Sequence, residues 1–206
     1  MKKIIYISLF LIIPSVAFSQ FLTKGGVRNA ALGGTGISSS NDISSSIWNP
    51  SLLGYFNRIE LLTDQRKFFW NLMNDNLAFN FISVGFPLGN FGTIAASTTF
   101  FNATNYNENK IGLHYGKSLF KRKVSFGFSL YSFSKNYEHN EYTLNDPFFE
   151  EFGNSRNAVD FDFGLSIRPA RNFKIGLIAQ NLLQTDLAIS LYDKDQLPLT
   201  FGTGIS

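Results

Sequence analysis

Residues 158–168 alternate apolar and polar side chains without a break, and this period constrains the fold more than any other feature of the chain. One side carries Val159, Phe161, Phe163, Leu165 and Ile167, and the other carries Asp160, Asp162, Gly164, Ser166 and Arg168. Successive side chains of a β-strand point to opposite faces of a sheet, so the pattern predicts a strand with one apolar and one polar face. The same alternation recurs at residues 111–116, 124–130 and 199–206.

Turn signals separate further candidate strands, and the connections alternate in length. The less regular strands are predicted near residues 57–63, 77–86, 92–101 and 173–182. Tight turns are predicted at residues 88–91, 121–123 and 169–172, and longer loops at residues 64–76, 102–109, 136–157 and 183–197. In the strand that starts at Val124 the large residues change sides after Leu130, which predicts a bulge or an interfacial aromatic at Tyr131 and Phe133. Short turns that alternate with long loops are typical of an outer-membrane β-barrel.

Composition points to the same class of protein. Aromatic residues make up 16% of the chain, and charged residues also only 16%, against about 25% in ordinary soluble domains. No cysteine is present, so no disulfide stabilises the chain. After the first residues no apolar run approaches the roughly 20 residues of a membrane helix. A chain of this kind crosses a membrane with strands; a soluble β-sandwich is the alternative.

The first 19 residues predict a cleaved export signal. Lys2 and Lys3 precede an apolar run at residues 4–18, and Ala17 and Ser19 supply the small residues of a cleavage site before Gln20. An uncleaved membrane anchor is the alternative, although the run is short for a bilayer span. Removal of this leader lowers the formal charge from +3 to +1. The basic pI is therefore no argument for nucleic-acid binding.

Residues 25–54 read GGVRNAALGGTGISSSNDISSSIWNPSLLG and resemble the N-terminal signature of the PorV/PorQ branch of FadL-like outer-membrane barrels. The positions that carry the resemblance are Arg28, Leu32, Gly33, Gly34, Asp42, Trp48, Asn49, Pro50 and Leu52. Two positions depart from the pattern, Asn41 and Ser51. Residues 179–182 and the segment from Leu197 onward are also similar to that branch.

The resemblance implies an all-β fold, a transmembrane antiparallel outer-membrane β-barrel with an N-terminal plug inside its lumen. Residues 20–56 would form the plug and residues 57–206 the barrel. The superfamily has about fourteen strands, whereas about eight are visible here, so we expect the N-terminal part of a larger barrel. An eight-stranded barrel has room only for side chains, which supports this expectation.

Glycine and serine suit a plug because they let its backbone approach the wall and supply hydrogen-bonding groups. Pro50 favours an extended Asn49 at the entry to the first strand, and Trp48 is predicted to be an apolar peg with one polar group. Arg28 and Asp42 are predicted to pair with each other or with lumen charges. An ordinary glycine- and serine-rich surface linker is the alternative reading of this segment.

No catalytic motif is present, so we expect neither an enzyme nor a cofactor or metal site. His114 and His139 lack the spacing of a zinc site. Asp160 and Asp162 are expected to meet basic residues of neighbouring strands. The loop at residues 137–157 mixes acidic and aromatic residues and is a possible partner-docking loop through Tyr142, Phe148, Phe149 and Phe152; a solvated loop without a partner is equally compatible with it.

The resemblance implies a protein of the outer membrane of a Gram-negative, Bacteroidetes-like bacterium, surrounded by outer-membrane lipid. Its expected role is to assist type IX secretion or the surface attachment of exported proteins, with secretion-machinery or cargo proteins as partners of its outer loops. The alternative is a FadL-type transporter of long-chain fatty acids or other hydrophobic small molecules. Nucleic acid is not an expected partner.

Overall fold

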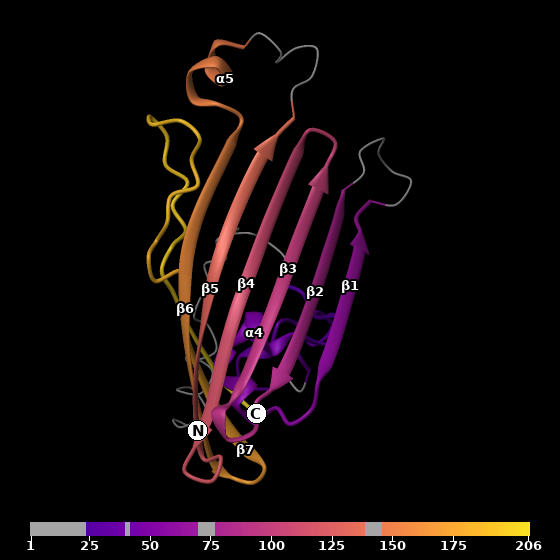
Figure 1. Ribbon diagram of the computed structural model, residues 1–206, viewed down its shortest axis with the longest axis vertical. Helices are drawn as coiled ribbons and strands as arrows, with labels where there is room; N and C mark the ends of the chain where they lie inside the picture. The colour runs from indigo at the N-terminus through magenta and orange to yellow at the C-terminus, as the bar shows by residue number, and fades with distance from the viewer. Residues whose placement is uncertain (1–23, 40–41, 70–76, 139–145) are drawn as a thin grey trace, which may run out of the picture.

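The computed structural model describes residues 24–39, 42–69, 77–138 and 146–206, which form one antiparallel sheet of eight strands in sequence order (Figure 1). The strands are β1 (Glu60–Lys67), β2 (Ala78–Pro87), β3 (Thr93–Ala103), β4 (Tyr106–Leu119), β5 (Val124–Tyr137), β6 (Ser155–Ala170), β7 (Phe173–Gln180) and β8 (Thr200–Ile205). The predicted antiparallel sheet is confirmed, and the fold is mostly β. The sheet is not closed into a barrel, because β1 and β8 are its two edges and do not pair with each other.

The strands extend further toward the upper end of Figure 1 than the sequence pattern indicates. The loop predicted at residues 102–109 is instead a tight turn of residues 104–105, with Ala103 opposite Tyr106 in the register of β3 and β4. The asparagines of this stretch suggested a loop, but they alternate with larger residues along paired strands. The rings of Tyr106 and Tyr137 lie 4.8 Å apart across β4 and β5 and support the extended pairing.

The bulge predicted in β5 is absent. The pairing of β5 with β4 continues in register from Val124 to Tyr137, and the pairing with β6 is equally regular. Tyr131 and Phe133 are each 1% exposed and lie on the same face of β5 as the buried Ser125 and Ser129. One face of this strand therefore changes from small residues to large aromatic residues along its length, without any change of phase.

Residues 24–39 and 42–55 lie against one face of the sheet, and we call them the inner segment and that face the inner face. The inner segment contains α2 (Val27–Ala31), α3 (Gly36–Ser39), α4 (Ser45–Trp48) and the 3₁₀ helix η1 (Pro50–Tyr55). η1 lies on β4, β5 and β6, and α3 lies on β7 and β8. Figure 1 shows these short helices at the lower half of the sheet.

The upper half of the inner face carries the main apolar core. Its buried members come from α4, β2, β5 and the segment between β7 and β8, and they are Ile47, Phe79, Phe81, Tyr131, Phe133, Leu187 and Leu197. Another cluster joins Ile43 and Leu53 of the inner segment to Ala95 of β3. The inner segment thus takes the place of large side chains in the lower half, and aromatic residues fill the upper half.

The opposite, outer face of the sheet exposes an apolar band. Its most exposed members include Ile82, Ile94, Ile111, Leu113, Phe128, Leu130, Val159, Phe163 and Phe201. Further up the same strands the outer face is polar, with Asn80, Asn109, Ser132 and Ser134. Within the described ranges no helix is both long and apolar enough to cross a membrane.

Candidate functional site: the inner segment on the sheet

Rows of small residues cross the inner face where the inner segment lies. Gly116, Gly127 and Gly164 stand directly opposite one another on β4, β5 and β6. A Cβ atom at Gly127 would lie 2.4 Å from the carbonyl carbon of Pro50, and a Cβ atom at Gly116 would lie 2.5 Å from the Pro50 oxygen. The absence of side chains here therefore allows the backbone of η1 to contact the backbone of the sheet.

Asn49 connects the inner segment to the sheet through its side-chain amide. Its Nδ2 group donates to the backbone oxygens of Ile37, at 2.8 Å, and Leu177 of β7, at 3.3 Å. Its Oδ1 atom accepts hydrogen bonds from the backbone N–H of Ser51, at 3.1 Å, and the Ser51 hydroxyl, at 2.7 Å. Asn49 is fully buried and extended, with φ −160°, as predicted from the proline that follows it.

Serine hydroxyls make further direct contacts between the inner segment and the sheet. Ser51 and Ser166 of β6 are hydrogen-bonded through their hydroxyls at 2.7 Å. The hydroxyl of Ser125 on β5 donates to the Ser51 carbonyl at 2.6 Å, and that of Ser129 donates to the Ser46 carbonyl at 3.3 Å. These five serines are almost completely buried. Backbone groups of the short helices are thus satisfied by the sheet, as a buried irregular segment requires.

His114 extends this polar network across the sheet. Its Nε2 atom lies 2.8 Å from the Ser97 hydroxyl on β3, and its Nδ1 atom lies 2.7 Å from the Ser129 hydroxyl on β5. Both ring nitrogens are therefore engaged with serines. No group of three or more His, Cys, Asp or Glu side chains able to hold a metal ion occurs in the part of the chain that the structure describes. His139 lies outside the described residues.

Trp48 packs on the glycines of the inner segment. A Cβ atom at Gly36 would lie 2.4 Å from the indole, and one at Gly34 would lie 3.4 Å from it. The indole Nε1 donates to the backbone oxygen of Gly25 at 2.9 Å, and the Lys24 ammonium lies 5.0 Å from the ring centre. Trp48 therefore holds the start and the middle of the inner segment together. Gly33 and Gly34 have positive φ and form the turn after α2.

The pairing of Arg28 and Asp42, with each other or with lumen charges, stays a prediction. Arg28 and Leu32 are exposed, and Asp42 accepts hydrogen bonds from the backbone and the hydroxyl of Ser44. The acidic residue that holds the start of the segment is Asp64 of β1, which accepts the Gly26 N–H at 3.1 Å and forms an ion pair with Arg66. Its position at the start of a predicted loop gave no indication of this role.

Asp160 and Asp162 point to the inner face, as their alternation predicts, where they accept hydrogen bonds from backbone amides and their charges also act on Lys110 of β4. Asp160 accepts the N–H groups of Leu183 and Thr185, at 3.0 and 3.2 Å, and Asp162 accepts that of Asn181 at 2.9 Å. These carboxylates hold the start of residues 181–199, which connect β7 to β8.

The connection from β7 to β8 folds back onto the inner face. Leu187 and Leu197 are buried in the apolar core, and Asp195 forms an ion pair with Lys135 of β5. Asp186 accepts the N–H groups of Ala188 and Asp195, at 3.0 and 2.9 Å. These two hydrogen bonds, that from Ala188 first, lower the pKa of Asp186. Sequence patterning predicted a loop here but not its inward course.

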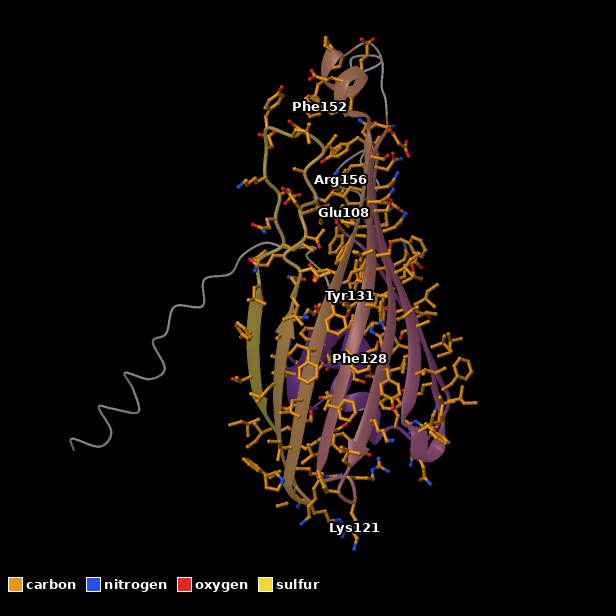
Figure 2. The ribbon with its side chains drawn as sticks, turned by 60° about the vertical axis from the view of Figure 1, so that its left-hand side comes forward. Glu108, Lys121, Phe128, Tyr131, Phe152 and Arg156 are labelled. Carbon is orange, nitrogen blue, oxygen red and sulfur yellow. The ribbon has the colours of Figure 1, made fainter. Side chains whose placement is uncertain are left out.

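The predicted docking loop contains the helix α5 (Pro147–Phe152), which lies at the upper end of the molecule (Figure 1). Asp146 caps it by accepting the Phe148 N–H at 3.0 Å. The Phe148 ring lies 5.5 Å from Phe149 and 5.3 Å from Phe152. Figure 2 shows Phe152 at this end and Lys121 at the opposite end. Tyr142, the fourth residue of the prediction, lies outside the described residues.

Two further aromatic residues complete this cluster: Tyr137, the first residue of the predicted loop, and Tyr192, which the sequence did not single out. Tyr192, from the connection between β7 and β8, meets Phe152 edge to face at 5.7 Å. Tyr137, at the end of β5, lies 6.3 Å from Phe149. We call α5 together with Tyr137 and Tyr192 the aromatic rim. Only the folded register brings these segments together, so no local motif could have indicated them.

Together, the long antiparallel sheet with an apolar outer band and a polar inner segment defines an all-β membrane protein. Residues 44–205 match the family model for the type IX secretion system membrane protein PorP/SprF. The match covers most of the chain, and the chain therefore belongs to the PorP/SprF family. No curated protein and no solved structure gives a match.

This finding corrects the resemblance to the PorV/PorQ branch of FadL-like barrels, which was wrong. Most of the signature that suggested that branch precedes residue 44, where the family match begins. The structure also gives a physical reason. Trp48 requires small residues at Gly34 and Gly36, and the close approach of η1 requires glycines on the sheet. Residue types that such packing demands do not distinguish one family from another.

Proposed function

We propose that the chain acts in type IX secretion as an outer-membrane barrel protein whose aromatic rim docks secretion-machinery or cargo proteins. Membership of the PorP/SprF family supports a membrane protein with secretion-machinery partners. The observation that carries the docking role is the exposed aromatic rim. Tyr192 is 83% exposed, its neighbour Leu191 86%, and Phe148 39%. Exposed aromatic residues on a preformed helix are typical of the anchors of protein interfaces.

The charge around the rim favours a partner with basic residues. Glu150 and Glu151 lie exposed on α5, and Asp193 lies beside Tyr192. Acidic groups at the edge of an apolar patch steer a partner of opposite charge and fix its orientation. A docking surface of this kind needs no catalytic group, which agrees with a family that is not known to be enzymatic.

The outer face supports insertion in a bilayer. At about 3.3 Å per residue the outward apolar stretch of β6, from Val159 to Ile167, is about 26 Å long before strand tilt, close to the roughly 25 Å band of outer-membrane barrels. The free backbone groups of β1 and β8 find no partner in lipid. We therefore expect both edges to pair with further strands in a closed barrel, with residues 20–56 as its plug and residues 57–206 in its wall.

The test is a double substitution, Phe148→Ala with Tyr192→Ala, in cells that lack the wild-type gene. We expect normal amounts of the protein in the outer membrane but loss of cargo from the cell surface, measured by profiling surface proteins. The matched control is Phe120→Ala, which removes a ring that is 74% exposed in the turn between β4 and β5.

Uptake of a labelled long-chain fatty acid, measured in the same strains, separates secretion from the transport alternative. Loss of uptake in the deletion strain with an unchanged surface proteome would reject the proposed secretion role. An unchanged surface proteome in the double variant, with loss in the deletion strain, would reject docking through the rim.

A further inference from the structure

A cavity of about 410 Å³ lies between the inner segment and the upper halves of β2 to β5. Its walls are mainly apolar and come from Ile47, Phe68, Phe69, Leu77, Phe79 and Phe101. This volume falls within the range of small-molecule sites, which are mostly apolar with a few polar groups that orient the ligand. The secretion role assigns no ligand to this cavity.

Three polar groups reach the cavity from different elements. Lys110 of β4 lies with its ammonium 3.8 Å from the ring centre of Tyr131 and 5.0 Å from that of Phe133. Tyr131 is 1% exposed, and its hydroxyl lies near the side chains of Ser129 and Asp162 without a hydrogen bond of regular geometry. Lys24 of the inner segment donates to the Gln180 side-chain oxygen at 2.7 Å. Two cations and one hydroxyl thus face a mainly apolar space, whose lining also includes Ser97, Thr99, Tyr106 and Glu108.

The acidic groups nearby accept hydrogen bonds from groups other than the two lysines. Asp162 accepts hydrogen bonds from the Asn181 N–H and the Gln180 amide, and Asp160 accepts those of residues 183 and 185. Glu108 also lines the cavity, but it accepts the Tyr106 hydroxyl and stands opposite Lys135 in the register. Among the described residues, neither Lys24 nor Lys110 forms an ion pair with these carboxylates.

The two ammonium groups repel each other in this site. Burial, and next the charge of Lys110, lower the pKa of Lys24 to about 8, which the charge of Asp162 offsets only in part. The charges of Asp160 and Asp162 act on Lys110, and that of Asp162 on Lys24, but neither lysine has an ion-paired carboxylate among the described residues. A cation withdrawn from water without an ion-pair partner is costly, and inside a membrane protein such a residue commonly marks a ligand or ion pathway. An anion placed between the two lysines would offset both their mutual repulsion and the cost of removing them from water.

We propose that this cavity binds an amphiphile with one anionic headgroup, held by Lys24, Lys110 and the Tyr131 hydroxyl, and with its apolar chain against the phenylalanines. A wholly apolar ligand supplies no negative charge to either ammonium group. A sugar or nucleotide does not match walls made mainly of phenylalanine. An alkyl carboxylate and an alkyl phosphate share the required chemistry.

The test measures equilibrium binding to the purified full chain in nanodiscs of phosphatidylcholine, with empty discs subtracted. The probes are labelled palmitate and hexadecyl phosphate, and hexadecanol is the uncharged comparison. We expect at least one anion to bind more tightly than the alcohol. Lys110→Gln and Lys24→Gln should each weaken that anion about tenfold, as expected for the loss of one hydrogen bond to a charged group, and leave the alcohol unchanged.

The matched control is Lys121→Gln, at an exposed turn far from the cavity (Figure 2), which should bind as the wild type does. Thr99→Phe fills the cavity and keeps both charges, so it should weaken the binding of all three probes. It also tests the proposal if a lysine variant does not fold. Equal affinity for the alcohol and both anions would overturn the proposal. So would wild-type anion binding by Lys110→Gln and Lys24→Gln, or by Thr99→Phe. These outcomes do not depend on secretion, so they are distinct from failure of the docking role.

Discussion

Asn49 shows how one side chain can determine the position of a whole segment. The sequence predicted its extended backbone from Pro50, and the structure confirms that conformation. Its hydrogen bonds to the backbones of Ile37 and Leu177 were not predictable, because these residues lie far from it in the chain, whereas the two bonds from Ser51 are local. Only an amide offers donors on one side and an acceptor on the other at this length.

We predict that Asn49→Asp destabilises the protein by at least about 3 kcal/mol, because it places a carboxylate against the carbonyl oxygens of Ile37 and Leu177 and leaves a buried charge without a partner. The measurement is urea unfolding of the purified protein in detergent. Asn90→Asp makes the same change at an exposed turn and should stay within about 0.5 kcal/mol of the wild type. Similar losses for both variants would contradict the role given to Asn49.

At the scale of the element, β5 shows what a sequence pattern can and cannot predict. Alternation correctly places Phe126 and Phe128 on one face and Ser125 and Gly127 on the other. The bulge predicted at Tyr131 was wrong. The inward residues of β5 are small where the inner segment covers them and large where it does not, and in the sequence this difference in size looks like a change of side. Local periodicity cannot report what lies against a strand, and this information is tertiary.

The same reasoning predicts that the row of Gly116, Gly127 and Gly164 determines how closely the inner segment packs on the sheet. Gly127→Val places a side chain where Pro50 lies, since even a Cβ atom would be 2.4 Å from the Pro50 carbonyl carbon. We expect a loss of about 1–3 kcal/mol from overpacking. We also expect faster proteolysis of residues 24–55 while the strands stay protected.

Limited proteolysis with mass spectrometry checks this expectation. Ser132→Val introduces the same side chain on the same strand but on the exposed outer face, and it should leave the cleavage pattern unchanged. A Gly127→Val protein with wild-type protection of residues 24–55 would show that the inner segment does not need the close approach.

For the whole molecule, the sequence predicted the antiparallel sheet and the apolar outer band well, because both follow from alternation within single strands. It failed for features that join distant segments, such as the inward course of residues 181–199 and the contact between Phe152 and Tyr192. The family assignment failed for a related reason. Glycine and serine in the inner segment report close packing, which many sheets with a covered inner face require.

The outer band gives a prediction about the whole molecule in its membrane. Phe128 lies within the band of β5, between Phe126 and Phe161, at ring distances of 6.5 and 6.2 Å (Figure 2). Ser134 lies on the same strand and the same face but above the band. A lysine should cost roughly 2–4 kcal/mol at the middle of a bilayer and about 0–1 kcal/mol near its surface.

We therefore expect Phe128→Lys to reduce the folded protein in outer-membrane fractions, whereas Ser134→Lys should leave it near the wild-type amount. Quantitative immunoblotting of membrane fractions, with heated and unheated samples to distinguish folded from unfolded protein, measures both. Phe128→Leu controls for the lost ring contacts and should resemble Ser134→Lys. An equal effect of lysine at both positions would mean that lipid does not cover this band, and the outer face would then have to be buried against protein.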